Sequence, residues 1–272
     1  MGTSSCWICP THRLPVPVRS WWRSRRPEWE RGIGCSTTPA GRWGCGLRRR
    51  WEWRARAGCW RSRRPKHLSR YFDGSKTIPD ETLQQLLRFL RSAPTSTNIQ
   101  PNHFYVVSTQ EVKERLAANL GERFQDNAEK ILNASHTIIL TTRVDVPEHH
   151  LEAVFAKERA DGRFADEAKQ ERWESMTRDF VSLRKYSYKD TYHWMEKQTY
   201  MVMGLTMMAA AELGVEAMPL EGFDPISVDK AFNIRATGYT TTVLLALGYP
   251  DEAKQYKTPV SRFEPERLFT FA

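Results

Sequence analysis

The most regular feature of the chain is a succession of apolar patterns between residues 79 and 248. Leucines recur at three- and four-residue spacing after Pro79, with Asp80 placed to cap that helix, and short β-branched runs follow. Further helices are predicted at about 109–119 (capped by Ser108), 127–134, 194–213 and 227–233, and strands at 103–108, 137–142, 215–218 and 240–248. Helices that alternate with strands indicate an α+β or an α/β sandwich.

One predicted helix, Trp194–Leu213, stands apart because Met, Ala, Gly and Leu surround nearly its whole circumference. Such a helix is buried on most faces, in a core or a subunit interface, and Gly214 is placed to end it. Residues 147–190 are charged and aromatic without a long apolar stripe, so we expect surface helices or a lid. Adjacent histidines point in different directions on a helix, so His149 and His150 are predicted to lie on a solvated face rather than to bind metal.

The basic charge of the chain is confined to its first quarter. Residues 1–65 hold 15 arginines and no lysine against three acidic residues, a net charge of +12, whereas the remainder holds 26 basic and 29 acidic side chains, a net charge of −3. The basic segment shows no sustained period, although Arg interleaved with Trp is compatible with nucleic-acid binding. The same composition arises when GC-rich DNA is translated in the wrong frame. We therefore expect residues 1–65 to be disordered or non-native and residues 66–272 to form the folded domain.

Cysteine spacing indicates neither haem nor structural zinc. Cys6 and Cys9 form a CxxC, but no histidine follows Cys9 directly, and no second close pair of cysteines exists. The chain also has no apolar run long enough for a membrane span or a secretory signal. Residues 66–272 contain no cysteine, which is compatible with a reducing cytosol. We expect a cytoplasmic protein without a metal or a membrane partner, and nucleic acid is not its expected ligand.

The segment APTSTNIQPNHF, residues 93–104, predicts a polar loop between a helix and a strand. Pro94 and Pro101 restrict its ends, and between them lie the uncharged polar residues Thr95, Ser96, Thr97, Asn98 and Gln100. Their hydroxyls and amides offer donors and acceptors without charge. Such a loop suits a large, flat ligand with heteroatoms at its edge, although an ordinary solvated connection is the alternative.

Several common sites are excluded by the motifs that the chain lacks. It has no GxGxxG after a strand, no phosphate-binding GxxxxGK[ST], no HExxH and no GxSxG. Three separated polar elements remain: the loop at 95–100, Asn127 with Lys130 on one helical turn, and the Pro219–Phe223 loop.

Six motifs in this order resemble the oxygen-insensitive NAD(P)H nitroreductase and dihydropteridine reductase family over residues 66–272. They are KHLSRYFDGSK, APTSTNIQPNHF, NAEKILNASH, ADGRF, PLEGFD and the terminal SRF. The resemblance implies an α+β fold with a central, mostly antiparallel sheet flanked by helices and a long helix buried in the core and dimer. It also implies a homodimer that holds FMN at the subunit interface without a glycine-rich motif.

The resemblance assigns the charged cofactor contacts to matching positions. Lys66, His67 and Arg262 would lie towards the FMN phosphate and ribityl chain. Asn127 and Lys130 would meet N1, O2 and N3 of the flavin, where an ammonium group stabilises the negative charge of the reduced ring.

Uncharged contacts follow from the same motifs. The ring edge and phosphate region would be lined by Thr95, Ser96, Asn98 and Gln100. After Pro219, the backbone amides of Glu221 and Gly222 would face N5 and O4. The space above the ring, where nicotinamide and acceptor bind in turn, would be bordered by Thr97, Phe124 and Phe164.

The activity implied by the resemblance is hydride transfer from NADH or NADPH to FMN and then to a nitroaromatic, quinone or pteridine, in ping-pong order. No side-chain acid or nucleophile is needed. Leu68 and Val260 depart from the family, which usually has a hydroxyl and a lysine there. The alternatives are another reaction on the same fold, such as dehalogenation or flavin cleavage, and a non-catalytic flavin-binding protein with a basic nucleic-acid-binding arm.

Overall fold

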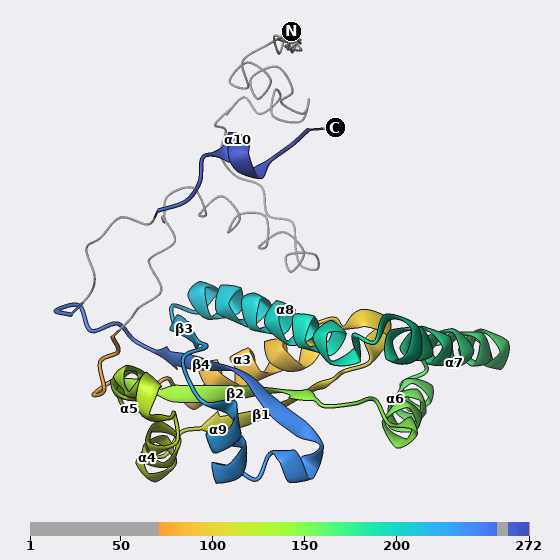
Figure 1. Cartoon of the computed structure of the whole chain (residues 1–272). Coiled ribbons are helices and arrows are strands. Elements are labelled where there is room, and N and C mark those ends of the chain that lie inside the picture. Colours follow the sequence, from red (N-terminus) through yellow and green to blue (C-terminus); the bar gives the residue numbers. More distant parts are fainter. Residues whose placement is uncertain (1–70, 255–260, 272) are drawn as a thin grey trace, which may run out of the picture. The chain divides into compact units, whose positions relative to one another are not determined.

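A computed structural model describes residues 71–254 and 261–271 of the chain (Figure 1). At its centre lies a sheet whose four strands, within the described residues, follow the order β1-β2-β4-β3. The strands are β1 (Asn102–Val107), β2 (His136–Arg143), β3 (Glu216–Leu220) and β4 (Tyr239–Gly248). Every strand pair in it is antiparallel, which confirms the α+β class and excludes a parallel α/β sheet.

Helices separate the strands along the chain. The α-helices are α3 (Asp80–Ser92), α4 (Gln110–Ala118), α5 (Ala128–Asn133), α6 (Glu148–Ala160), α7 (Glu167–Ser182), α8 (Thr191–Glu212), α9 (Pro225–Ala231) and α10 (Pro265–Leu268). Short helical turns are η4 (Ser96–Asn98), η5 (Glu122–Asn127), the π-helical η6 (Leu183–Tyr188) and η7 (Arg235–Thr237).

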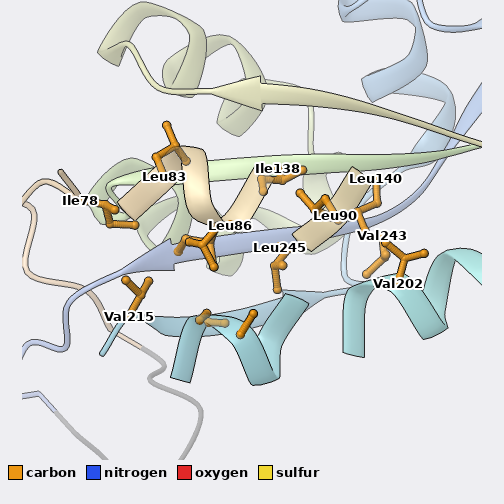
Figure 2. Close-up of a cluster of buried hydrophobic side chains, with 14 residues drawn as sticks. Ile78, Leu83, Leu86, Leu90, Ile138, Leu140, Val202, Val215, Val243 and Leu245 are labelled. Atoms are coloured by element: carbon orange, nitrogen blue, oxygen red, sulfur yellow. The ribbon is translucent and has the colours of Figure 1, made fainter. Parts of the chain in front are cut away.

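The two central strands are buried on both faces, so each contributes to two hydrophobic layers. Ile138 and Leu140 of β2 pack with α3 and α8 on one face, as Figure 2 shows, whereas Ile139 packs on the other face with α4, α5 and α9. In β4, Val243 and Leu244 divide between the two faces in the same way. The alternation is the two-residue period of a strand, and it explains why both strands read as continuous apolar runs.

A third hydrophobic cluster lies where α6, α7 and the start of α8 meet. It contains Ile99, Val146, Leu151, Val154, Phe155, Val181, Trp194 and Met195. The expected surface helices at 147–190 are therefore present, but α6 carries the buried apolar stripe that the sequence analysis did not find there. This cluster matters for function because it contains a residue of the polar loop, Ile99.

Two predicted helix caps are wrong by one residue. Pro79, not Asp80, is the N-cap of α3. The Asp80 carboxylate instead lies in the first turn, where its negative charge interacts favourably with the helix dipole. Thr109, not Ser108, caps α4, because its hydroxyl oxygen accepts a hydrogen bond from Val112 N at 3.4 Å.

The expected loop at 219–223 is also shorter than predicted. Pro219 belongs to β3, where it pairs with Leu245, and the loop begins only after Leu220. The predicted end of the long helix is confirmed, because Gly214 follows α8 with a φ of 73°. Among the described helices, none is both long and apolar enough to cross a membrane.

Candidate functional site

The loop between α3 and β1 has an unusual backbone. Thr97, Asn98 and Gln100 have φ angles of 51°, 54° and 45°, in the left-handed region. Only glycine adopts that region without steric cost, and asparagine tolerates it best among the other residues. Within the loop, Thr95 Oγ1 accepts a 3.0 Å hydrogen bond from the backbone N–H of Gln100. Three left-handed residues in four positions store strain that neighbouring contacts must offset.

Contacts from two helices hold this strained loop. The Ile99 side chain is fully buried in the third cluster, and its carbonyl oxygen lies 2.7 Å from Nε2 of His150 on α6. The backbone N–H of Ser96 donates a 2.9 Å hydrogen bond to Oε1 of Gln198, a buried residue of α8. The loop is therefore fixed by tertiary contacts as well as by its two prolines.

His150 corrects the prediction that both adjacent histidines lie on a solvated face. His149 is exposed, but His150 turns inward to the Ile99 carbonyl. Burial lowers the pKa of the His150 imidazole, with smaller contributions from Arg143 and His149, while the hydrogen bond to Ile99 opposes this change. A carbonyl only accepts hydrogen bonds, so His150 Nε2 carries the proton in this pair.

The ADGRF motif, residues 160–164, forms the C-terminal cap of α6, and the side chain of Glu158 just before it reaches the loop. Gly162 has a φ of 63°, its N–H donates to Arg159 O at 3.0 Å, and the N–H of Arg163 donates to Glu158 O at 3.1 Å. These two bonds form a Schellman motif. The Glu158 carboxylate also accepts a 2.7 Å hydrogen bond from Asn98 Nδ2, which brings the cap and the loop together.

Phe164, the last residue of that motif, is half-buried. Its ring lies 6.0 Å from the ring of Trp173 on α7, and the Arg163 guanidinium stacks over both rings. Two of the three predicted substrate-binding residues, Thr97 and Phe164, thus lie on two segments that Asn98 and Glu158 connect.

A second group of predicted residues forms around the loop that follows β3. Asn127 Nδ2 donates a 2.8 Å hydrogen bond to Gly222 O, and Lys130 Nζ donates to Asn127 Oδ1 at 2.5 Å. The Phe124 ring also packs here, because a Cβ built on Gly222 would lie 3.2 Å from Phe124 Cδ1. Within the described part of the chain, no carboxylate pairs with the Lys130 ammonium. The structure therefore brings four predicted residues together around a half-buried positive charge.

The neighbouring Glu221 has a partner that the sequence analysis missed. Tyr200 on α8 donates a 2.9 Å hydrogen bond from its hydroxyl to Glu221 Oε1. Burial, followed by this hydrogen bond and the negative charge of Glu221, raises the pKa of Tyr200 to about 12. The phenol therefore stays protonated at neutral pH and holds the Glu221 side chain.

Within one chain, these two groups of residues lie beside the two opposite edge strands of the sheet. The polar loop leads into Asn102 at the start of β1, whereas Gly222 follows the end of β3, and the order β1-β2-β4-β3 places these strands at opposite edges. Three strand spacings separate them, about 14 Å, since neighbouring strands lie about 4.8 Å apart. No hydrogen bond among the described residues joins the loop to Asn127, Lys130 or Gly222.

Of the three predicted phosphate-side cations, one, Arg262, lies among the described residues. Lys66 and His67 lie outside the described residues, as do Leu68 and Val260. Arg262 lies in the segment 261–271, where its side chain is exposed and donates to Ser261 O at 2.6 Å. Their assignment to the FMN phosphate stays a prediction, as does the domain boundary at residue 65.

Comparison with known proteins identifies the family. The model of the nitroreductase family matches residues 61–249, more than half of the chain. The chain belongs to the nitroreductase family. The motif order in residues 66–272 therefore identified the family correctly.

Individual relatives match over most of their length. The oxygen-insensitive NAD(P)H nitroreductase of Salmonella typhimurium is 34% identical over 184 residues, which cover 68% of this chain and 85% of that protein. The major NAD(P)H-flavin oxidoreductase of Aliivibrio fischeri is 28% identical over 207 residues, 75% of this chain and 94% of that protein.

Solved structures give the same fold. A protein of Exiguobacterium sibiricum, assigned as a nitroreductase and solved in complex with FMN, superposes with a TM-score of 0.63 at 20% identity. The alignment covers 75% of this chain and 92% of that one. At 20% identity, this match shows that the two proteins share a fold and shows nothing further.

Three residues that hold the candidate site together were missed by sequence reasoning. Gln198 accepts a hydrogen bond from Ser96, and Tyr200 donates one to Glu221. Glu158 accepts one from Asn98. A usable signal existed for two of them, because Gln198 and Tyr200 are polar groups within the most apolar helix of the chain. Among the described residues, no cluster of three or more His, Cys, Asp or Glu side chains is placed to hold a metal ion.

Proposed function

We propose that this nitroreductase is an FMN-dependent oxidoreductase that takes reducing equivalents from NADH or NADPH and passes them to a nitroaromatic, quinone or pteridine acceptor. The observation that carries the proposal is the Lys130 ammonium, held by the Asn127 amide against the loop at Gly222. The relatives named as an NAD(P)H nitroreductase and an NAD(P)H-flavin oxidoreductase support it.

The donor set around Lys130 fits a flavin. The pyrimidine edge of the ring combines donors and acceptors, and it gains negative charge on reduction. Asn127 and Lys130 offer an amide and a cation, and no carboxylate within the described residues neutralises that cation. The positive charge is thus available to a ligand that becomes anionic.

When bound, FMN would supply the two-electron redox chemistry, reduced by NAD(P)H in one half-reaction and reoxidised by the acceptor in the other, in ping-pong order. The side chains then have to bind, orient and exclude water. Lys130 would stabilise the charge at N1 and O2, and the backbone after Pro219 at Glu221 and Gly222 would meet N5 and O4. Thr97, Phe124 and Phe164 would shape the space in which nicotinamide and acceptor bind in turn.

The separation of the two groups within one chain supports a homodimer. We place the polar loop of one subunit, with Thr95, Ser96, Asn98 and Gln100, against the Asn127 and Lys130 group of the other, so that FMN lies at the interface. An apolar stripe on α8 supports the same assembly. It consists of Met201, Leu205 and Met208, whose side chains are 43%, 41% and 52% exposed at helical spacing. Exposed apolar rows of this kind are typical of subunit contacts.

A cytoplasmic location belongs to the same proposal. It is supported by the absence of cysteine from residues 66–272, which suits a reducing compartment.

The absorbance spectrum of the purified full-length chain tests the proposal directly. A yellow protein with a flavin spectrum that NADH or NADPH bleaches without oxygen, and that an acceptor restores, is the expected result. A nitroaromatic, a quinone and a dihydropteridine compared as acceptors then give the order of preference. A chain that stays colourless after incubation with FMN would overturn it, and DNA binding that weakens steeply with salt would favour the nucleic-acid alternative.

A further inference from the structure

The buried carboxylate of Glu158 occupies a position where the pattern of its helix calls for an apolar residue. Along α6 the buried residues are Leu151, Val154, Phe155 and Glu158, the spacing of one helical face. Glu158 is 4% exposed, although glutamate is rarely buried to this degree unless it is paired. Packing alone therefore does not explain a glutamate at this position.

The hydrogen bonds of Glu158 explain why a carboxylate lies there. Glu158 Oε1 accepts hydrogen bonds from Asn98 Nδ2 at 2.7 Å and from Arg163 Nη1 at 2.6 Å. The backbone carbonyl of Glu158 accepts a further hydrogen bond from Arg163 N. One residue therefore ties the strained polar loop to the turn that carries Phe164.

The energetics argue against stability as the main role of this pair. Glu158 Oε2 is buried and makes no hydrogen bond to a described residue, which is costly. Arg163 keeps 40% of its side chain exposed, so the ion pair is only partly shielded from water. Whole buried ion pairs are often replaced by apolar residues without loss of stability, and the exposed Arg163 guanidinium can stay solvated when Glu158 alone is replaced.

We propose that Glu158 is a positioning residue of the flavin and acceptor site, which it serves by fixing Asn98 and Phe164 relative to each other. The inference rests on the proposed function, in which Asn98 contacts the flavin and Phe164 borders the acceptor. In the homodimer, Glu158 would organise the part of the site that one subunit contributes to its partner's FMN. It touches neither ligand, and it acts through the left-handed Asn98 and through Arg163.

Glu158→Leu is the test variant, because leucine suits the apolar stripe while it removes both hydrogen bonds. Glu174→Leu is the matched control: Glu174 is 6% exposed, lies on the adjacent helix α7 and pairs with Arg159, and its hydrogen bonds to described residues include none to the loop. The readouts are the melting temperature, the FMN dissociation constant, and kcat and KM for the acceptor in full-length holoenzyme.

The expected result is a melting temperature of Glu158→Leu close to that of wild type, with the FMN dissociation constant and the acceptor KM each raised about tenfold, the effect of one or two lost hydrogen bonds. Glu174→Leu should leave both binding constants unchanged. For FMN binding, Asn98→Ala combined with Glu158→Leu should be no worse than Asn98→Ala alone, because Glu158 acts on the flavin only through Asn98.

A second variant covers the case in which Glu158→Leu does not fold. Arg163→Ala changes a side chain at the surface and should raise the acceptor KM about tenfold while kcat changes little. Unchanged constants in a folded Glu158→Leu or in Arg163→Ala, or additive losses with Asn98→Ala, would overturn the inference while the proposed function stands. A wild-type chain that binds no FMN would overturn both.

Discussion

The side-chain amide of Asn127 donates a 2.8 Å hydrogen bond to the carbonyl oxygen of Gly222, 95 residues further along the chain. A Cβ at position 222 would lie 2.5 Å from Asn127 Nδ2 and 3.2 Å from Phe124 Cδ1. The missing side chain is therefore what lets the turn at Asn127 approach the loop after β3. Gly222 is not among the residues with positive φ, so its role is close approach rather than backbone freedom.

Gly222→Ala should weaken FMN binding about tenfold, because the methyl group displaces the Asn127 amide and breaks one hydrogen bond. Titration of the FMN-free protein with FMN, followed by flavin fluorescence, measures the change. In an Asn127→Ala background the amide is absent, so Gly222→Ala should cost much less there. Equal losses in the two backgrounds would show that the contact with Asn127 is not the cause.

Lys130→Met should slow the bleaching of bound FMN by NADPH about a hundredfold, because it removes the cation proposed to stabilise the reduced ring. The rate is measured by anaerobic stopped-flow absorbance at saturating FMN, so that weakened binding does not contribute. Lys157→Met is the control, since Lys157 is an exposed lysine whose partner is Asp161. An unchanged bleaching rate in Lys130→Met would remove Lys130 from the proposed mechanism.

Secondary structure and family were predictable from the sequence because they depend on short-range patterns. The apolar runs of β2 and β4 and the leucine spacing of α3 gave the elements within a few residues. Cap positions differed from the prediction by one residue. At α4 a neighbouring polar side chain, Thr109, takes the role predicted for Ser108, whereas α3 begins one residue earlier than predicted, after Pro79, which makes no side-chain cap.

The conformation of the site could not be predicted in the same way. Thr97, Asn98 and Gln100 adopt left-handed backbone because Ile99 is buried and His150 and Glu158 hold the loop from a helix about 50 to 60 residues away. No local pattern indicates such contacts. The inward direction of His150 depended equally on the tertiary fold, since exposed His149 precedes it on the same helix.

His150 should make the protein less stable in mild acid. Burial lowers the pKa of the folded imidazole below its usual 6.5. As pH falls through about 6.5, the unfolded chain binds a proton that the folded chain does not, so the free energy of unfolding decreases. His150→Gln removes this proton uptake and keeps a donor for the Ile99 carbonyl.

The measurement is the melting temperature of the wild type and of His150→Gln between about pH 7.5 and 5. The wild-type value should fall more steeply over this range. His136, whose pKa is also lowered by burial, remains in both proteins and contributes equally to both curves. Parallel curves would mean that His150 does not carry the acid sensitivity.

Met208→Glu tests whether the exposed stripe on α8 forms the dimer interface. A carboxylate at this position would be buried without a partner in the assembly, which is costly, so the variant should sediment as a monomer. Because we place the polar loop and Lys130 of one flavin site on different subunits, the same variant should lose bound FMN.

Met176→Glu is the matched control, because Met176 on α7 is 49% exposed against 52% for Met208 but lies outside the stripe. Sedimentation velocity with detection at both protein and flavin absorbance reports assembly and cofactor together. The control should remain dimeric and yellow. A monomeric Met208→Glu that keeps its FMN would contradict a site shared between subunits, since one chain would then hold the cofactor with its own Asn127 and Lys130. A dimeric, FMN-loaded Met208→Glu would place the interface elsewhere.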